Sequence, residues 1–514
     1  MPIIISMNNN FIYLIIGMLT KKNALNISGF FKHLQYLENK TVFVYKNKNF
    51  SYQWLLKNSK KLASWLNLHR FTVLMFTTKN SPLTALLYLG GWLACRSIFP
   101  INPRLISHEL IQIITKISPS VLLIEPKQVD IKLINYCSKY NIVLKIINSP
   151  LTFIQNLQHK NTNIDIYPIN NQAVTYHVSS GTGGEHNYYG HTLSQILTYS
   201  YHRQFDLGLK PNDKLLISLS LNHAYAFSYQ LLPGLAMGLS MVLLPEFDTK
   251  IVKYAITHHK ITTIALLPTM YYLLCRSIQN RDKYNHRLRF LSVAGDQVQP
   301  TLMKMVRKIL GIPLKNGIGM TEVYGYGQNT QANVTTSKIK LFDEIQCKIN
   351  PLSLKTIQMT KRTIGEIYLK TPTQPIGYND KWLATGDLGY LDNNRYLYFF
   401  GRMKNIIIKG GSNVSPVEIE HYLCQISSVD EVAVIGRKHK VWGTLICACI
   451  VTNNHMNFLT KANINEYLSD YLSAYKHIDE VYFMKKLPKN KMGKLDRSSL
   501  IEEVSNFFCR NETN

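Results

Sequence analysis

Short apolar strands alternate with helix-length segments twice along this chain, and this alternation most constrains its fold. It occurs in residues 41–125 and again in 215–300, where runs such as 73–76 (Val-Leu-Met-Phe) and 121–124 (Val-Leu-Leu-Ile) are apolar at every position. Strands without polar residues on either face must be covered on both sides, as happens when helices connect the strands of a parallel sheet. The pattern predicts an α/β protein with two similar halves and mostly parallel sheets.

The elements become shorter and more self-contained after about residue 404. Ser415 is placed to cap a helix that Pro416 begins, and Glu418 completes the sequence of a capping box. The segments expected here are helices at 416–426 and 464–472 and strands at 432–435, 445–451 and 480–484. We therefore expect an N-terminal domain over 1–403 and a separate α+β domain over 404–514, of ordinary domain size.

A carboxylate and a guanidinium stand beside glycines just before this predicted boundary. Two buried strands are expected to end at Asp387 and Arg402, with a hairpin over 390–400 between them. Held by tight backbone turns, such a pair could bind the sugar and phosphate of a nucleotide, or it could belong to a plain surface hairpin. The local pattern leaves both interpretations open.

Three further stretches have compositions that suit a bound phosphate. In 179–187, hydroxyl residues lie between glycines, so that hydroxyl and backbone N–H groups can converge on an anion, although the Gly-Lys-Ser/Thr of a Walker motif is absent. A glycine-rich turn is expected before Thr321 and Glu322, a pair that suits a phosphate oxygen and Mg²⁺. In 487–497, Lys494 could present a point charge to a phosphate. Each stretch alone could equally be an ordinary loop or turn.

Together and in this order, the four stretches resemble the ANL superfamily of adenylate-forming enzymes. This superfamily includes acyl- and aryl-CoA ligases, the adenylation domains of nonribosomal peptide synthetases and firefly luciferase. The resemblance extends over residues 50–497 and is strongest at 385–387 (Thr-Gly-Asp), 401–402 (Gly-Arg) and 493–494 (Gly-Lys). It implies a large N-terminal domain of α/β subdomains and a small mobile α+β C-terminal domain.

The resemblance implies that ATP binds along these motifs. Asp387 would bind the ribose hydroxyls, Arg402 would assist at ribose and phosphate, and 179–187 would order the outer phosphates. The implied nucleotide-binding residues are Ser179, Ser180, Gly181, Thr182, Gly184, Asn316, Gly319, Asp387 and Arg402. Gly183 and Asn187 stand where the family usually has a hydroxyl residue and a lysine, which would weaken the grip on the outer phosphates.

The resemblance also implies the residues that act in catalysis. The implied catalytic residues are Lys494, Thr321, Glu322 and His223. Thr321 would contact the α-phosphate, and Glu322 would be the metal ligand for Mg²⁺. Lys494 would bridge the substrate carboxylate and the α-phosphate, where a positioned cation offsets the meeting of two anions. Lys404 would be the hinge about which the C-terminal domain rotates before a thiol displaces AMP.

The acid and the acceptor are implied by position. His223 falls where the family has its Pro-x-x-His motif, and the Asp of amino-acid-activating domains is missing, so a fatty, other acyl or aryl acid is expected. On its own, His223 could equally be an interior histidine. The expected neighbours of the acyl group are Tyr225, Phe227, Ala294, Gly295 and Gly319. Lys409, Gly410 and Gly411 would meet the acceptor, which is coenzyme A or, as the second choice, the phosphopantetheine of an acyl carrier protein.

The leading hypothesis is therefore an ATP-dependent acid–thiol ligase that acts through an acyl-adenylate. ATP, Mg²⁺ and coenzyme A are its expected cofactors, and a small carboxylic acid is its expected substrate. The alternative is a degenerate relative that binds a nucleotide or a partner without turnover, because the loop at 183–188 departs from the family sequence.

The net charge of +27 raises a third possibility, nucleic-acid binding. The lysines and arginines are scattered and no recognition motif accompanies them, so no specific nucleic-acid partner is expected. The apolar run at 11–19 is too short to span a bilayer, and the eight cysteines lack metal-ligand spacing and fit free thiols in a reducing compartment. We expect a soluble, cytoplasmic protein with no transmembrane segment.

Overall fold

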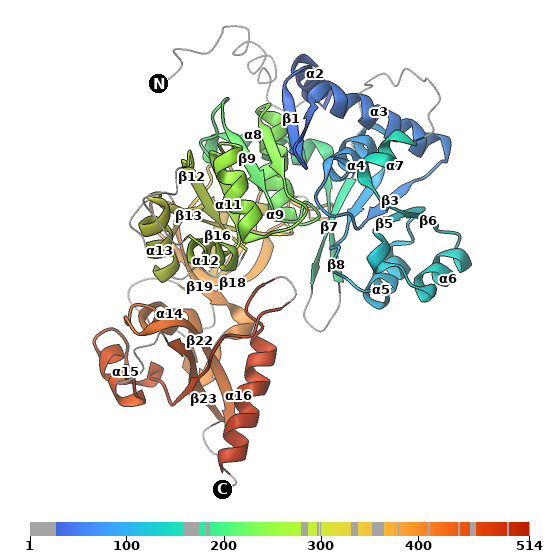
Figure 1. The fold of residues 1–514 in the computed structure, drawn as a ribbon. Coiled ribbons are helices and arrows are strands. Elements are labelled where there is room, and N and C mark those ends of the chain that lie inside the picture. Colours follow the sequence, from blue (N-terminus) through green and yellow to red (C-terminus); the bar gives the residue numbers. More distant parts are fainter. Residues whose placement is uncertain are drawn as a thin grey trace.

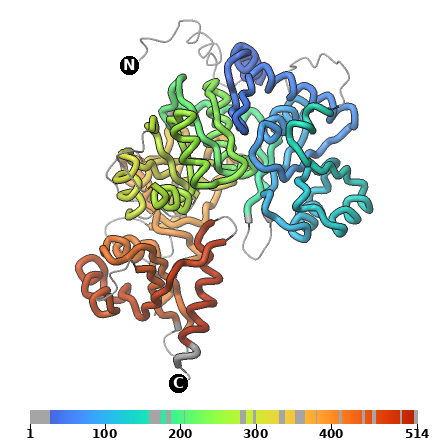
Figure 2. Tube along the Cα trace, in the orientation of Figure 1, coloured from blue at the N-terminus to red at the C-terminus, as the bar shows by residue number. Residues whose placement is uncertain are grey.

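The computed structural model divides into a large N-terminal part and a smaller C-terminal part (Figure 1). The residues that it describes are 27–157, 174–180, 186–278, 286–295, 298, 300–329, 338–351, 364–378, 380–409, 412–439, 443–452, 459–490 and 493–512. In Figure 2 the orange-to-red C-terminal part lies below the green and yellow half of the N-terminal part. No helix among these residues is long and apolar enough to cross a membrane.

In the part of the chain that the structure describes, the first sheet has six strands in the order β6-β5-β3-β4-β7-β8. All adjacent pairs are parallel except β7–β8. The strands are β3 (Val73–Phe76), β4 (Ser97–Pro100), β5 (Val121–Ile124), β6 (Val143–Ile146), β7 (Val174–Ser180) and β8 (His186–Thr192). The helices of this half are α3 (Tyr52–Leu68), α4 (Pro82–Leu93), α5 (Ser107–Ile117), α6 (Ile131–Lys139) and α7 (Pro150–Gln155). Every residue of α4 is buried, as its uniformly apolar sequence requires.

The second sheet has thirteen strands within the described ranges, and its central region is parallel. The parallel strands are β1 (Thr41–Tyr45), β9 (Lys214–Ile217), β10 (Ser240–Leu243), β11 (Thr263–Leu266) and β12 (Phe290–Val293), with β2 (Lys48–Ser51) at the edge. Strand β1 precedes the whole first sheet in the chain, yet it pairs with β10 of the second sheet. The helices of this half are α2 (Ile27–Tyr36), α8 (Leu193–Asp206), α9 (Ala224–Ala226), α10 (Leu232–Ala236), α11 (Thr249–His258), α12 (Pro268–Arg276) and α13 (Pro300–Leu310), with a π-helical turn (Phe227–Leu231) between α9 and α10. The predicted α/β class with two α/β halves is confirmed.

The next strand still runs parallel to β12, and beyond that strand the second sheet becomes antiparallel. The added strands are β13 (Leu314–Met320), β14 (Tyr324–Gln328), β15 (Lys338–Leu341), β16 (Gln346–Pro351), β17 (Gly365–Lys370), β18 (Leu383–Leu391) and β19 (Tyr396–Arg402). The glycine-rich turn expected before Thr321 was wrong, because those glycines lie within β13. A Cβ atom at Gly319 would lie 2.8 Å from the Tyr324 carbonyl oxygen, so glycine lets β14 approach closely. Asp387 lies in the middle of β18, not at a strand end as expected.

Among the described residues, the C-terminal part holds a three-stranded sheet between helices and a separate two-stranded sheet. Its elements are β20 (Ile407–Lys409), β21 (Ser412–Val414), α14 (Pro416–Leu423), β22 (Val429–His439), β23 (Gly443–Thr452), α15 (Lys461–Ser469), β24 (Glu480–Phe483) and α16 (Arg497–Glu512). Alternate residues of β22 face two separate cores. Val432 and Val434 pack in the core that includes residues of α14 and α15, whereas Ala433 and Ile435 pack with Leu500 of α16.

The start of α14 differs from the predicted capping box. Ser415 accepts a hydrogen bond from the Glu418 N–H at 3.3 Å, so the predicted N-cap is confirmed. The Glu418 carboxylate, however, accepts hydrogen bonds from the Lys476 ammonium at 2.8 and 2.9 Å. Lys476 is 1% exposed, and a buried ammonium needs a paired carboxylate, which explains why Glu418 does not close the box.

Candidate active site

A cavity of about 250 Å³ lies at the carboxyl ends of the parallel strands in the second sheet. Its walls come from the segments that follow β9, β10, β11 and β12, together with β13, which is where open α/β sheets usually bind ligands. The residues that shape its interior are Ser218, Leu219, His223, Ala224, Tyr225, Tyr229, Phe247, Leu267, Met270, Ala294, Gly295, Gly317, Ile318, Gly319, Thr321 and Tyr324. Lys494 of the C-terminal part also lines it.

The structure brings Lys494, His223 and Thr321 to this one cavity. Lys494 lies on a loop in which its N–H donates to the Asn490 Oδ1 atom at 3.1 Å. Gly493 has φ +80°, and a Cβ atom there would lie 3.4 Å from the Thr269 hydroxyl at the start of α12. The loop therefore lies against α12, one of the helices that cover the second sheet. This contact brings a cation from the C-terminal part into a cavity of the N-terminal part.

His223 faces the cavity from the segment between β9 and α9. Burial, together with the smaller effects of the Lys494 and Arg104 charges, lowers its pKa to about 4. The imidazole is therefore neutral at physiological pH, so it can act as a hydrogen-bonding group without adding a charge beside Lys494.

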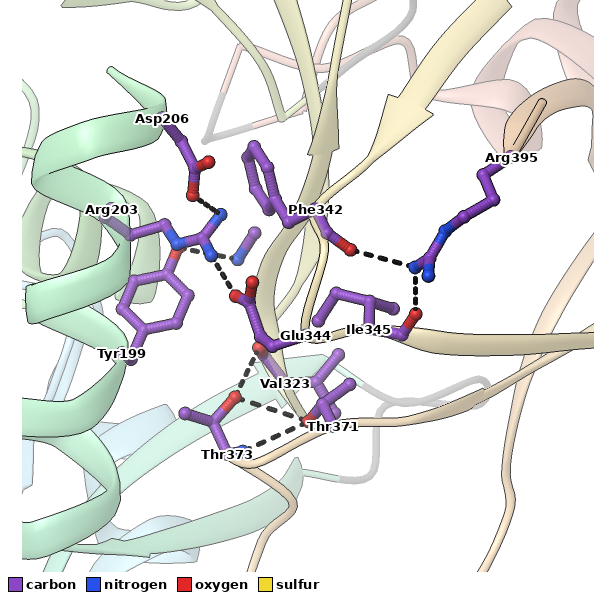
Figure 3. Close-up of polar contacts among 11 residues, drawn as sticks. Tyr199, Arg203, Asp206, Val323, Phe342, Glu344, Ile345, Thr371, Thr373 and Arg395 are labelled. Atoms are coloured by element: carbon purple, nitrogen blue, oxygen red, sulfur yellow. Dashed lines mark hydrogen bonds and ion pairs between the residues drawn. The ribbon is translucent and has the colours of Figure 1, made fainter. Parts of the chain in front are cut away.

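Thr321 and Glu322 lie on the turn that joins β13 to β14. The His191 Nε2 atom lies 2.9 Å from the Glu322 carbonyl oxygen, and the Thr373 hydroxyl donates to the Val323 carbonyl at 3.1 Å (Figure 3). The Tyr189 hydroxyl hydrogen-bonds with the Glu322 carboxylate. Burial, followed by the charge of Glu322, raises the pKa of Tyr189 to about 12.

The Glu322 carboxylate fits a Mg²⁺ site that is completed by a nucleotide. Within the described residues, no group of three or more His, Cys, Asp or Glu side chains could hold a metal ion. Magnesium ions commonly bind one or two carboxylates together with substrate phosphates and water, so a single glutamate is sufficient.

Asp387 and Arg402 face each other on the paired strands β18 and β19. The Arg402 Nε atom lies 2.8 Å from the Asp387 Oδ1 atom, with Asp387 buried and the Arg402 side chain 46% exposed. Burial raises the pKa of Asp387 to about 6, and the Glu322 and Glu366 carboxylates act in the same direction while Arg402 opposes them. The influence of Glu322 on Asp387 means that the two carboxylates share one electrostatic environment.

Backbone geometry holds Asp387 at this position. Its N–H donates to the Thr385 hydroxyl at 3.1 Å, and that hydroxyl donates to the Ile367 carbonyl at 2.8 Å. Gly386 has φ +69°, a conformation that glycine adopts without strain. The Thr-Gly-Asp sequence therefore fixes the direction of the carboxylate through a side-chain hydrogen bond and a left-handed residue.

Other predicted site residues lie apart from the cavity or outside the described residues. Asn316 is buried on β13, and Ser179 lies near the end of β7. Lys404 is exposed in the 3₁₀ turn that follows β19, and the Lys409 ammonium is bound by Asp479 at 2.7 Å. Predicted residues outside the described part are Gly181, Thr182, Gly184, Gly410 and Gly411, and the Ser180 side chain.

The predicted neighbours of the acyl group lie in the cavity wall with one exception. Tyr225, Ala294, Gly295 and Gly319 line it. Phe227 does not line the cavity, because its ring is fully buried and stacks on Tyr88 with the ring centroids 4.4 Å apart.

Sequence reasoning missed residues that reach the site from distant segments. Lys79 and Arg104 line the cavity from loops that follow β3 and β4 of the first sheet. Both residues lie just beyond the carboxyl end of a strand, where open α/β sheets usually bind ligands. Their positions could therefore have been used to predict them as site residues. Tyr189, His191 and Thr373 carry no comparable local signal.

Comparisons with known proteins agree over most of the chain. The family model described as "AMP-binding enzyme" matches residues 30–378, and that described as "AMP-binding enzyme C-terminal domain" matches residues 418–494. The 2-succinylbenzoate–CoA ligase of Oceanobacillus iheyensis is 31% identical over 312 residues, which are 57% of this chain and 62% of that ligase. The indoleacetate–CoA ligase of Aromatoleum aromaticum is 26% identical over 502 residues, which cover 92% of this chain and 97% of that ligase.

Solved structures show the same fold. Crystalline ATP-bound MatB from Rhodopseudomonas palustris superposes with a TM-score of 0.83 at 21% identity, over 94% of this chain and 99% of that one. The o-succinylbenzoate CoA synthetase of Bacillus subtilis, in complex with its acyl-adenylate intermediate, superposes with a TM-score of 0.74 at 22% identity, over 92% and 97% of the two chains.

Proposed function

The chain belongs to the AMP-binding enzyme family, within the adenylate-forming ANL superfamily, and on this premise we propose that it is an ATP-dependent ligase that joins an aryl acid to coenzyme A. In the first step a carboxylate oxygen attacks the α-phosphorus of ATP, and pyrophosphate leaves. In the second step the thiol sulfur attacks the acyl carbon, and AMP leaves. The observation that carries this proposal is the convergence of Lys494, His223 and Thr321 on one cavity.

Each residue of the site has a proposed part in adenylation. The Lys494 ammonium bridges the incoming carboxylate and the α-phosphate, which reduces the repulsion between two anions as they meet. The Thr321 hydroxyl donates to the α-phosphate, and Asp387 binds the ribose hydroxyls with Arg402 beside it. Glu322 would hold Mg²⁺, which neutralises phosphate charge when bound.

The walls of the cavity favour an aryl acid over a fatty acid. Ala224, Leu267, Met270, Ala294 and Ile318 give it apolar surface. The rings of Tyr225, Tyr229, Phe247 and Tyr324 also line it and can pack against a flat substrate by offset stacking or edge contacts. The two ligases that resemble the chain are named for aryl acids, 2-succinylbenzoate and indoleacetate.

The second half-reaction requires the C-terminal part to change its position relative to the N-terminal part. We place a pivot at Lys404, between domains of residues 1–403 and 404–514, because it is exposed in the short turn between the two parts. Rotation would withdraw Lys494 and admit the acceptor while the reactive adenylate stays shielded from water. Coenzyme A is the proposed acceptor, with a carrier-protein phosphopantetheine as the alternative outcome.

Exchange of labelled pyrophosphate into ATP tests the proposed adenylation. We expect exchange that depends on an aryl acid, in a panel that also contains fatty acids, dicarboxylic acids and amino acids. Thioester formation is then followed with coenzyme A and, separately, with a carrier protein. Binding of ATP in a calorimeter without exchange for any acid would instead establish the non-catalytic alternative.

Substitution of Gly317 tests whether this cavity receives the acid. A Cβ atom at Gly317 would lie 3.7 Å from the Ala294 Cβ atom and 3.7 Å from the Tyr229 hydroxyl, both ordinary contacts. We therefore expect Gly317→Ala to fold normally and to lower kcat/KM roughly tenfold for a bicyclic aryl acid, since one methyl group in a pocket has about this effect. Benzoate serves as the internal control, and kcat/KM for benzoate should change less than about threefold. Equal losses for both acids would place the acid elsewhere.

A further inference from the structure

We propose that His191 and Thr373 are positioning residues that hold the Thr321–Glu322–Val323 turn in place for MgATP. This inference rests on the proposed function, since it concerns the same site. In this turn, the carbonyl oxygens of Glu322 and Val323 are bound by side chains from distant parts of the chain.

His191 provides the first of these bonds. It lies on β8 with no exposed surface, and its Nε2 atom is 2.9 Å from the Glu322 carbonyl oxygen. Because a carbonyl oxygen only accepts, the imidazole must donate, which places its proton on Nε2. Strand β8 belongs to the first sheet and the turn belongs to the second, so this bond connects the two sheets at the site.

Thr373 provides the second bond from the segment after β17. Its hydroxyl donates to the Val323 carbonyl at 3.1 Å, and its own N–H donates to the Thr371 hydroxyl at 3.2 Å (Figure 3). Thr373 and Val323 are both buried, and a buried carbonyl that lost this donor would be left without a water to replace it. The hydroxyl therefore fixes the position of the backbone immediately after Glu322.

Tyr199 on α8 holds the strand that leaves the turn. Its hydroxyl accepts a hydrogen bond from the Gly325 N–H at 3.0 Å. The Arg203 guanidinium lies 5.0 Å from the centre of the Tyr199 ring and 3.6 Å from that of Phe342, and it pairs with Asp206 at 2.8 Å and with Glu344 (Figure 3). The Arg203 side chain, which is fully buried between these groups, keeps Tyr199 in one orientation.

These contacts have a functional consequence because of what the turn carries. Thr321 lines the cavity and Glu322 is the proposed Mg²⁺ ligand, so both act directly beside the anchored carbonyls. Transfer of the adenylyl group from ATP to the acid depends on placing such groups to within a fraction of an ångström. Loss of one anchor should therefore weaken MgATP binding and its reaction, and should leave the acid-binding wall unchanged.

Paired substitutions separate the hydrogen bonds from packing. Thr373→Val removes the hydroxyl with little change of shape, and Thr373→Ser restores it. His191→Leu removes the donor, and His191→Gln returns an N–H near the Nε2 position. Thr262→Val is the matched control, because it also removes a threonine hydroxyl that donates a hydrogen bond (to the Asp213 carboxylate, 2.7 Å) but lies at the opposite end of β11 from the cavity.

The experiment measures KM for ATP, KM for the acid, the Mg²⁺ concentration for half-maximal rate, and calorimetric MgATP affinity in the whole protein. We expect Thr373→Val and His191→Leu to raise KM for ATP and the Mg²⁺ requirement, and to weaken calorimetric MgATP binding, by roughly five- to tenfold, with KM for the acid unchanged. The serine and glutamine variants should return within about twofold of the parent. Thr262→Val should lower the melting temperature and leave all four values unchanged.

Two results would overturn the inference: parent-like MgATP affinity in both disrupted variants, or equal losses in the disrupted and restored variants of each pair. If the parent protein supports no exchange with any acid, the proposed function fails, and the calorimetric comparison still decides the role of the two anchors.

Discussion

Lys494→Ala is expected to lower aryl-acid-dependent pyrophosphate exchange about 100- to 1,000-fold, the usual cost of removing one preorganised group that stabilises developing charge. The reason is electrostatic: the Lys494 side chain reaches the cavity from outside the N-terminal part and adds a positive charge beside a histidine that burial keeps neutral. His223 is uncharged at neutral pH, so it cannot replace the positive charge of Lys494. The loss should appear mainly in kcat, because the cation acts most strongly where the two anions meet.

The same variant should largely retain the second half-reaction. Thioester formation from a chemically prepared acyl-adenylate and coenzyme A is measured in parallel, and a loss of less than about threefold is expected because charge repulsion no longer opposes that step. Lys486→Ala is the control, since Lys486 is exposed on the same segment and does not line the cavity. Equal loss of both half-reactions in Lys494→Ala would contradict the proposed role.

Asp387→Asn is expected to reduce kcat/KM for ATP about 100-fold and, at the same time, to stabilise the protein. The loss follows from replacing a charged acceptor of ribose hydroxyls with a neutral amide. The gain follows from the pKa of Asp387, which burial raises to about 6 in the folded protein. An asparagine has no charge to bury, so at pH 8 the free energy of unfolding should rise by up to about 3 kcal/mol.

The predicted gain in stability of Asp387→Asn depends on pH, and the direction of that dependence can be measured. Because the folded protein binds the Asp387 proton more tightly than the unfolded chain does, the parent loses stability as pH rises from about 4 to about 6. The difference between Asp387→Asn and the parent should therefore be small near pH 4 and complete above about pH 6. In the parent, kcat/KM for ATP should fall below about pH 6 as Asp387 takes up its proton, and the variant should lack this limb.

A carboxylate on the same hairpin provides the control. Asp392 accepts hydrogen bonds from the Asn394 and Tyr396 N–H groups in the turn between β18 and β19, and Asp392→Asn keeps these acceptors. It should change neither ATP kinetics nor the pH profile. If the difference in stability between the parent and Asp387→Asn did not change between about pH 4 and about pH 6, that result would contradict the raised pKa of Asp387.

The local sequence was sufficient to predict those parts of the site that depend on backbone conformation. The Thr-Gly-Asp motif was readable because its glycine adopts φ +69° and its threonine bonds within two residues, so the chemistry is contained in the motif. The parallel strands were readable because burial on both faces leaves an uninterrupted apolar run. In both cases the cause and the signal lie in the same few residues.

Other features depend on partners that are remote in sequence. Glu418 has the spacing of a capping box, but Lys476 is buried beside it and takes its carboxylate. The glycines before Thr321 suggested a turn, but they serve the close pairing of β13 with β14. His191 could not be assigned from sequence because its contact with Glu322 joins residues 131 positions apart in two different sheets.

The pairing of β1 with β10 has a consequence for how the chain reaches its fold. The Ser240 hydroxyl donates to the Thr41 carbonyl across 199 positions, and the whole first sheet lies between these two strands in the chain. During synthesis, β1 and its hairpin partner β2 would leave the ribosome long before β10 exists, at translation rates of about 5–20 residues per second. The apolar side chains of β1 therefore lack the strand β10 for seconds at least, and a chaperone that shields this N-terminal segment would lower its risk of aggregation.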